Sequence, residues 1–372
     1  MSSSSILFQN ASKSVILLDL PRSIEEAQVP SDRLTNVDPP KLRRLVSAPP
    51  PSAAFPTPEP KTRIGAPTTS AASQISALMT LCAADSALAE IRHSHAGPWY
   101  LPRIYSRGSP NDNTKPPLSP PTPNSSSYII PPSSHFLHGT ISSRRQTFLS
   151  TAPPQFNLIL LDPPWPNRSA KRKRTGTTYH TVRDYASIHD LLSLIPIASH
   201  LAPDCLVGVW VTNSPQAVEV LTSPQGGLFM QWDVEVVGEW IWLKVTTEGE
   251  PVVSLDSEWR KPWERLVIGR KRGGKGGGKI GTKVVVTVPD VHSRKPNLRR
   301  FFEEEGLVPG EYEALEVFAR NLTAGWWAWG DEVLLFQHRE HWREADEQDA
   351  VAEKNGNAAS AADGWGLTEP GL

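Results

Sequence analysis

At residues 156–165 the chain reads Phe-Asn-Leu-Ile-Leu-Leu-Asp-Pro-Pro-Trp, an apolar run closed by a carboxylate, two prolines and an indole. A short run rich in Leu and Ile that ends in prolines is typical of a buried strand entering a rigid turn. We therefore expect a strand over 156–161. The turn after it presents the Asp162 carboxylate, two consecutive carbonyls whose prolines donate no N–H, and one large aromatic face.

This turn suits an exocyclic aromatic amine. The carboxylate of Asp162 and the carbonyl of Pro163 can accept both amine protons, while the ring of Trp165 can stack on the base. The lone pair of an adenine amine is delocalised into the ring. Two acceptors that pull the amine hydrogens toward tetrahedral geometry localise that lone pair and aim it at an electrophile. The alternative is structural, a strand end capped by Asp and stiffened by prolines.

From residue 128 onward, predicted strands alternate with predicted helices. The strands are expected over 156–161, 206–211, 233–243, 264–269, 283–288, a segment ending at Phe318 and about 332–337, and the helices over 184–195, near 214–222 and from near Asn297. This alternation predicts an α/β fold with three layers around a mixed, mainly parallel sheet. Ligands of such folds bind outside the carboxyl ends of the strands.

Composition divides the chain into four parts. Residues 1–25 suggest a small hairpin, 128–342 a folded domain, and 343–372 a disordered tail. The Pro-rich N-terminal extension 26–127 lacks hydrophobic periodicity, so we expect it to be mostly disordered. One helix is expected near 74–92, either packed on its own domain or serving as a partner-binding segment.

Positive charge is local rather than global. The formal net charge is −1, so no overall field indicates a nucleic-acid partner. Three basic runs stand out, formed by Arg168 with Lys171, Arg172, Lys173 and Arg174; by Arg270, Lys271, Arg272, Lys275, Lys279 and Lys283; and by Arg294, Lys295, Arg299 and Arg300. A local stripe of this kind is sufficient to hold phosphates.

Other patterns exclude several classes of protein. Cys82 and Cys205 are far apart and unpatterned, which indicates neither a zinc site nor a disulfide framework and fits a reducing compartment. The Gly-rich segment 271–281 lacks the Gly-Lys-Ser/Thr spacing of a phosphate-binding loop, so we interpret it as a surface insertion. No secretion signal or bilayer-length apolar run is visible, and we expect a soluble protein without a metal ion.

The chain resembles the DPPW-type N6-adenine methyltransferase family, and within it the methyltransferase-like protein 4 branch. The motif Leu161–Trp165, followed by Asn167 and Ser169, carries the resemblance. Further matching blocks follow in family order, at 210–213, 239–244, 261–264, 292–296, 316–321 and 325–332. The resemblance covers 128–342 and implies a Rossmann-like fold. It also implies transfer of a methyl group from S-adenosyl-L-methionine to the N6 amine of adenosine in RNA, with small nuclear RNA favoured.

The resemblance also implies roles for individual residues. Catalysis falls to Asp162, Pro163, Pro164 and Trp165; cofactor binding to Lys295, Glu316, Arg320, Asn321, Asp331, Glu332, Gly139 and Thr140; and substrate binding to Asn167, Lys171, Arg172, Lys173, Arg174, Tyr179, Trp263 and Glu264. Simpler alternatives remain for some of them. Glu316 and Arg320 can form a structural ion pair, Lys295 can be a solvated charge, and Tyr179 an ordinary surface residue.

Two departures from the family pattern bear on the cofactor. Leu137-His138-Gly139-Thr140-Ile141 replaces a segment that carries an Asp in the family, and Asp331 stands where an Asn is usual. A carboxylate accepts hydrogen bonds but cannot donate them, and this changes the expected contacts. These departures keep a non-catalytic RNA-binding subunit as an alternative. A DNA N6-adenine methyltransferase is the other alternative, because the sequence has no helix-turn-helix or zinc finger that decides between RNA and DNA. We expect the nucleus, with the cytoplasm as an alternative, and a protein partner through the N-terminal region.

Overall fold

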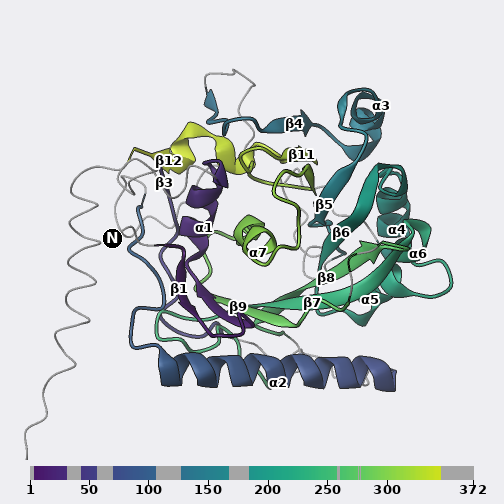
Figure 1. The fold of residues 1–372 in the computed structure, drawn as a ribbon. Coiled ribbons are helices and arrows are strands. Elements are labelled where there is room, and N and C mark those ends of the chain that lie inside the picture. The colour runs from purple at the N-terminus through teal and green to yellow at the C-terminus, as the bar shows by residue number, and fades with distance from the viewer. Residues whose placement is uncertain are drawn as a thin grey trace, which may run out of the picture.

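The computed structural model describes residues 4–31, 43–56, 70–105, 127–166, 184–257, 260–274, 276 and 278–344. Within them ten strands form one sheet in the order β1-β2-β9-β7-β8-β6-β5-β10-β11-β4 (Figure 1). The strands are β1 (Ile6–Gln9), β2 (Val15–Leu18), β4 (His135–His138), β5 (Phe156–Leu161), β6 (Leu201–Val211), β7 (Val234–Lys244), β8 (Trp263–Lys271), β9 (Lys283–Thr287), β10 (Ala314–Val317) and β11 (Trp327–Gly330).

Most neighbouring strands run parallel, and the predicted mixed, mainly parallel sheet is confirmed. β5 lies between β6 and β10 and is parallel to both. β8 is antiparallel to β6 and to β7, and β1 is antiparallel to β2. The sheet therefore places the carboxyl ends of β5, β6 and β10 at one edge, where the start of β8 also lies.

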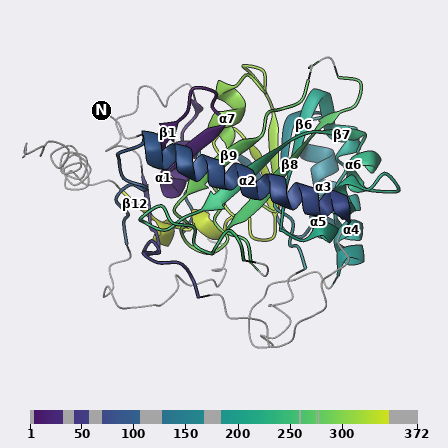
Figure 2. The same cartoon turned by 90° about the horizontal axis from the view of Figure 1, so that it is seen from below.

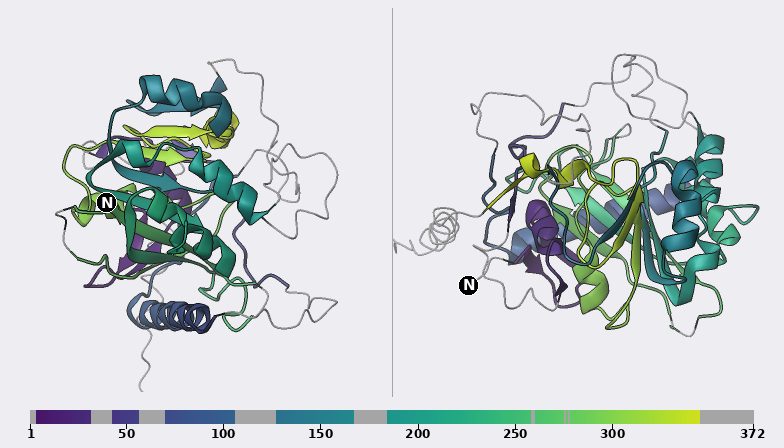
Figure 3. Two further views of the ribbon diagram at one scale, coloured as in Figure 1. Left: turned by 90° about the vertical axis from the view of Figure 1, so that its right-hand side faces the viewer. Right: turned by 90° about the horizontal axis from the view of Figure 1, so that it is seen from above.

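Helices cover both faces of the sheet, which completes the predicted three layers (Figures 1 and 3). One face carries α3 (Ile141–Thr151), α4 (Tyr185–Ser193), α5 (Pro215–Thr222) and α6 (Leu228–Gln231), and the other carries α1 (Leu20–Ala27) and α7 (Arg299–Glu304). Alternate residues of β5 enter the two cores. Ile159 packs on the α3–α6 side, whereas Leu158 and Leu160 pack on the α1 and α7 side.

The N-terminal hairpin belongs to this sheet, because β2 pairs parallel with β9 and β1 forms the edge. The long helix α2 (Ala71–Ser94) lies beneath β2, β7 and β9 (Figures 1 and 2). Its residues Ala84, Leu88 and Ile91 are buried in a third core cluster with those strands. The helix is therefore packed on its own domain.

Parts of the extension expected to be disordered are ordered. β3 (Arg44–Leu45) pairs with β12 (Trp342–Arg343), and Leu45 and Leu101 are buried. Long-range polar contacts hold these segments, such as the hydrogen bond from the Leu101 N–H to the carboxylate of Asp19 at 2.8 Å. Such contacts leave no periodicity in a sequence, which is why the expectation failed. Residues 57–69 and 106–126 lie outside the described residues.

The predicted last strand over 332–337 is wrong. Three short 3₁₀ helices occur in the described residues, η5 (Ala198–His200), η6 (Leu335–Gln337) and η7 (Arg339–His341), and the last strand of the main sheet is β11. Val333 and Leu334 are buried in a small cluster with Leu322, so their apolar character reflects packing of a turn. In the described part of the chain, no helix combines the length and apolar character that crossing a membrane demands.

Candidate active site

One face of the sheet gathers the charged side chains of the site. Asp162 follows β5 and continues the alternation of Leu158 and Leu160, so it lies on the α1 and α7 side. Glu316 in β10 pairs with Leu160 in register and lies on the same face. Two residues share this face at the same edge by the same alternation, Lys244 at the end of β7 and Glu264 near the start of β8.

Asp162 lies between two cations. The Lys295 Nζ donates to both carboxylate oxygens, at 2.8 Å to Oδ1 and 2.9 Å to Oδ2. The Arg320 Nη1 donates to Oδ2 at 3.0 Å. The side chain of Asp162 is 14% exposed, and its backbone N–H donates to the carbonyl of Val317. The Asp162 backbone is therefore fixed to β10, while its side chain remains partly exposed.

Lys295 also contacts a second carboxylate. Its Nζ lies 3.2 Å from Oε2 of Glu264, whose other oxygen accepts from the Lys244 Nζ at 2.5 Å. Burial alone favours the neutral carboxyl, but the charges of Lys295 and Lys244 lower the pKa of Glu264 to about 2. Burial also opposes the charge on Lys295, yet Asp162 and Glu264 raise its pKa above the usual value. Glu264 and Lys295 are therefore both charged at neutral pH.

Two indole rings flank the ammonium of Lys295. Its Nζ lies 5.7 Å from the ring centroid of Trp210 and 5.9 Å from that of Trp242. The Lys244 Nζ lies 4.2 Å from the Trp242 ring. Cation–π attraction to these rings stabilises the positive charges on the sheet. Lys244, Trp210 and Trp242 are site residues that were not predicted from the sequence. The alternation Trp240-Ile241-Trp242-Leu243-Lys244 was the signal that could have indicated Trp242 and Lys244.

Arg320 links Asp162 to Glu332. Its Nε donates to Oε2 of Glu332 at 2.8 Å while its Nη1 contacts Asp162. Although burial disfavours the charged guanidinium, these two carboxylates raise the pKa of Arg320. Asn321 follows directly and is 9% exposed. The structural ion pair between Arg320 and Glu316, considered as an alternative from the sequence, is not formed. Arg320 pairs with Asp162 and Glu332 instead.

Glu316 is a carboxyl of the site that has no basic partner among the described residues. In the described part of the chain, no hydrogen bond or ion pair joins its side chain to another residue. Burial, and secondarily the charge of Asp162, raise the pKa of Glu316 to about 8, although Lys295 lowers it. The site therefore holds a carboxyl that is largely neutral at pH 7 and that a bound cation would ionise.

The turn after β5 is tightly held. The carbonyl of Pro163 accepts the Trp165 N–H at 2.8 Å, which leaves one lone pair for another donor. The indole N–H of Trp165 donates to the carbonyl of Trp210 at 2.7 Å, and Trp165 is only 8% exposed. Pro164 is half-buried. Trp165 thus lies mainly in the core, and its stacking on a base stays a prediction.

The remaining predicted cofactor residues lie where β11 and β4 end. The Gly139 N–H donates to the carbonyl of Gly330 at 3.0 Å, and Gly139 has a φ of +144°, which a side chain rarely adopts. Thr140 caps the N-terminus of α3. Asp331 is exposed, and its carbonyl contacts the His138 ring. These residues lie at the same edge as Arg320, so the fold brings the predicted cofactor set together.

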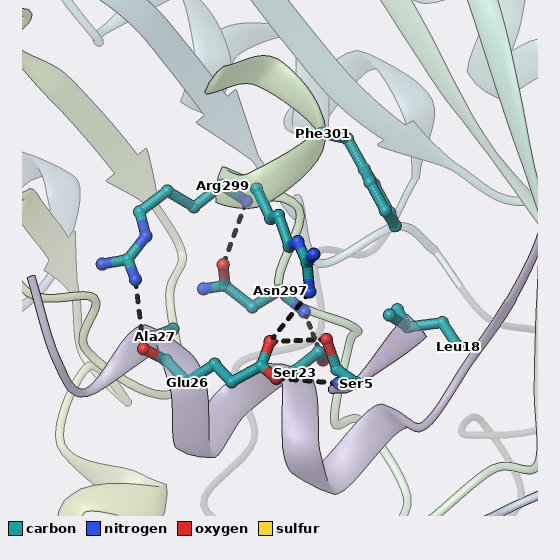
Figure 4. A pocket seen from close by; sticks show the side chains of 9 residues that line it. Ser5, Leu18, Ser23, Glu26, Ala27, Asn297, Arg299 and Phe301 are labelled. Carbon is teal, nitrogen blue, oxygen red and sulfur yellow. Dashed lines mark hydrogen bonds and ion pairs between the residues drawn. The ribbon is translucent and has the colours of Figure 1, made fainter. Parts of the chain in front are cut away.

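A small cavity is lined by residues of α1 and of the segment 297–301, which follows Lys295 in the chain (Figure 4). It has a volume of about 10 Å³, room for a single water, and lies between α1 and α7. The Asn297 N–H donates to Oγ of Ser23 at 3.1 Å, and the Arg299 Nη2 donates to the carbonyl of Glu26 at 3.0 Å. Because α1 fixes the chain in this way, the backbone near Lys295 is held in place.

Of the predicted substrate residues, two are described and six are not. Asn167, Lys171, Arg172, Lys173, Arg174 and Tyr179 lie outside the described residues. Trp263 is buried on the opposite face of the sheet, against α2, because neighbouring residues of a strand point to opposite sides. Glu264 does lie in the site, where its carboxylate pairs with Lys244 and Lys295.

Several described members of the second and third basic runs are buried and are not available to a phosphate. Lys283 is buried and pairs with Glu305. Arg294 and Arg299 are also buried, and Arg294 pairs with Asp290 at 2.7 Å. These members therefore stabilise the fold. The exposed members Arg272 and Lys279 remain accessible to a phosphate.

Comparison with known proteins agrees with this geometry. Residues 156–332 match the MT-A70 family. The chain is 51% identical over 343 residues to the N6-methyladenosine RNA methyltransferase MTA1 of Cryphonectria parasitica, covering 92% of this chain and 95% of that protein. It is 44% identical to the protein of the same name from Pyricularia oryzae, covering 90% and 96%.

A more distant relative is the human N(6)-adenine-specific methyltransferase METTL4, which is 38% identical over 223 residues, or 57% of this chain and 44% of that protein. The matched family region begins at β5 and ends at Glu332, so it contains Asp162, Lys295 and Arg320. On the strength of these matches, and of a site assembled from the same segments, the chain belongs to the MT-A70 family.

Proposed function

We propose that this protein transfers a methyl group from S-adenosyl-L-methionine to the N6 amine of adenosine in RNA. The observation that carries the proposal is the position of Asp162. It lies at the carboxyl end of a central parallel strand, 14% exposed, beside Lys295, Arg320 and Glu316. The relatives named as N6-methyladenosine RNA methyltransferases support the same reaction over nearly the whole chain.

The residues of the site fit the cofactor. S-adenosyl-L-methionine carries a carboxylate, an ammonium and a sulfonium, and it supplies an electrophilic methyl group when bound. Lys295 is a cation suited to the carboxylate, and the unpartnered carboxyl of Glu316 is suited to a cationic group. Arg320, Asn321 and Glu332 offer donors and acceptors for the ribose hydroxyls at the same edge. Gly139, Thr140 and Asp331 lie next to them.

The chain's own residues activate the amine by orientation. Asp162 accepts one N6–H, and the free lone pair of the Pro163 carbonyl accepts the other, so the nitrogen lone pair points away from both. The amine becomes acidic only after it is alkylated, so its proton leaves late and no strong base is required. Reaching this pocket requires the adenosine to leave its stack.

RNA is the favoured substrate because the two relatives that cover most of the chain are named for it. The name of the human relative specifies adenine without naming RNA or DNA, which keeps DNA as the alternative. We further propose small nuclear RNA as the target, the nucleus as the location and a protein partner through the N-terminal region. Lys171–Arg174 supply a basic run that suits both nuclear import and phosphate contact.

A tritiated methyl transfer assay on RNA, single-stranded DNA and duplex DNA tests the proposal. We expect label in N6-methyladenosine, with RNA labelled fastest. Label in DNA alone would show that the substrate is DNA rather than RNA. Label in no nucleic acid would overturn the proposal.

A second candidate is a non-catalytic RNA-binding subunit, which the departures at Gly139, Thr140 and Asp331 favour. The Asp162 turn, which is intact and held in place, argues against it. Equilibrium binding of S-adenosyl-L-methionine separates the two, because a scaffold has no need of the cofactor.

A further inference from the structure

The acceptor that the proposed function needs is already engaged. Both oxygens of Asp162 accept from cations, with Lys295 on Oδ1 and both Lys295 and Arg320 on Oδ2. A carboxylate whose charge is shared with an ammonium and a guanidinium attracts a neutral amine weakly. In this arrangement Asp162 attracts the N6 amine only weakly, and the release of one cation from Oδ1 would strengthen that attraction.

The two cations differ in how firmly they are held on Asp162. Arg320 is fixed from its other side by Glu332, at 2.8 Å, and it donates to Oδ2. Lys295 is a compact charge on a flexible stem, and among the described residues it is the cation on Oδ1. Arg320 therefore sets the orientation of Asp162, whereas Lys295 covers the oxygen that could serve the substrate.

Lys295 can move without moving the backbone. Arg294 is buried and donates to Asp290 and to the carbonyl of Val46, and the Asn297 N–H donates to Ser23. These contacts fix the chain on both sides of Lys295. Its ammonium also lies 3.2 Å from Glu264, which Lys244 holds in place, so a second carboxylate keeps the charge nearby after it leaves Asp162.

We infer that Lys295 is a latch on Asp162: its ammonium covers Oδ1 until it exchanges that oxygen for the carboxylate of the cofactor, and the freed Oδ1 then accepts the N6 amine. The inference rests on the proposed function. It makes Lys244 and Glu264 positioning residues for the latch. The exchange replaces one charged hydrogen bond by another, so it is close to balanced, whereas leaving Lys295 without a partner is costly.

The latch predicts that the amino-acid part of the cofactor prepares the site for the base. The probe is an oligoribonucleotide that the enzyme methylates, compared with the same strand carrying purine riboside, which lacks the N6 amine, at the target position. Fluorescence anisotropy gives the two dissociation constants. The constant for the purine riboside strand divided by that for the adenosine strand reports what the amine contributes to binding. This ratio is measured with no addition, with 5′-methylthioadenosine and with S-adenosylhomocysteine.

We expect a ratio near one with no addition and with 5′-methylthioadenosine, which has no carboxylate. S-adenosylhomocysteine, which has one, should raise the ratio to about ten, the factor that about 1.4 kcal/mol represents. Lys295→Met should raise the ratio without any cofactor. Lys261→Met is the matched control, because Lys261 binds the Leu255 carbonyl and should leave the wild-type pattern unchanged.

Equal ratios with the two cofactor analogues would overturn the latch, and so would a folded Lys295→Met protein with no amine preference. The wild-type comparison decides the matter even if that variant does not fold. Methyl transfer to the same strand is measured in parallel. Transfer that persists alongside equal ratios removes the latch and leaves the proposed function standing, whereas absence of transfer to any nucleic acid removes both.

Discussion

The indole N–H of Trp165 donates to the backbone carbonyl of Trp210 at 2.7 Å, which ties the turn after β5 to the end of β6. Both residues are buried, so the bond has no water to replace it. Trp165→Phe keeps an aromatic ring but leaves that carbonyl unpaired. We expect a loss of about 1–3 kcal/mol in the free energy of unfolding and a slower turnover, because Asp162 lies in the same turn.

Urea denaturation and single-turnover methyl transfer measure the two effects. Phe148→Leu is a control that disturbs the same core without touching the turn. A Trp165→Phe protein that turns over at the wild-type rate would show that this hydrogen bond does not position Asp162.

Asp162→Asn should abolish methyl transfer without weakening cofactor binding. The fold should be nearly unchanged, because Lys295 and Arg320 keep Glu264 and Glu332 as carboxylate partners. An amide keeps one acceptor oxygen, but it loses the negative charge and places a donor beside that oxygen, so it orients the amine poorly. Losing one preorganised electrostatic contact typically costs about 100-fold or more in kcat. Turnover and calorimetric binding of S-adenosylhomocysteine are measured together, and turnover equal to that of the wild type would refute the role of Asp162.

Glu316 predicts a pH dependence of stability. Its pKa is about 8 in the folded protein, against an ordinary value of 4.5, so between these values the folded chain holds a proton that the unfolded chain has lost. Stability therefore falls as pH rises through that window. Glu316→Gln cannot titrate, and it should gain stability over the wild type from about pH 5 to about pH 8.

The difference between the two urea midpoints is the quantity to follow across that range. Asp19, whose pKa burial raises to about 6, is present in both proteins and cancels. Two midpoint curves that stay parallel over the whole range would mean that Glu316 is ionised in the folded protein.

Asp290 should be essential for stability although it lies outside the site. Its carboxylate accepts from Arg294 at 2.7 Å and from the Ala48 N–H at 2.7 Å, and Arg103 lies 3.7 Å away. All three side chains of this ion cluster are at most 1% exposed. Asp290→Asn leaves two buried guanidinium groups without their counter-charge, which should cost about 3–5 kcal/mol.

Denaturant unfolding measures this loss, with Arg92→Gln as the control. Arg92 pairs with Glu250 at an exposed position, and such pairs contribute at most about 1 kcal/mol. Similar losses in the two variants would contradict the importance of the buried cluster.

The basic run Lys171–Arg174 should carry phosphate contacts. Replacing Lys171 and Arg172 by Gln is expected to weaken RNA binding and to lower the salt slope by about 1 for each contact removed. The control replaces Arg272 and Lys279, the exposed members of the second run. Should only the control change the slope, the RNA follows the Gly-rich segment instead.

The sequence predicted the elements near the site well because their signals are local. The strand of 156–161 and its Pro-rich turn occur as expected, since an apolar run closed by prolines has few alternatives. The segment 332–337 was predicted as a strand because it is apolar. Its buried residues pack a turn instead, and an apolar run does not by itself distinguish a turn from a strand. The ordered positions of Arg44 and Leu101 were not predicted, because the residues that they contact, Glu25 and Asp19, are distant in sequence.

By itself, the sequence determined the fold class, the family and the acidic turn, because each is written in a short run of residues. Only the tertiary structure decided how the charges are shared. It buried Arg294 and Arg299 and placed Lys295 on Asp162 rather than in solvent. It also left Glu316 without a basic partner in the described part of the chain. The reason is physical, since a pattern records which residues alternate, whereas the pairing of charges depends on strands and loops that meet only in the folded chain.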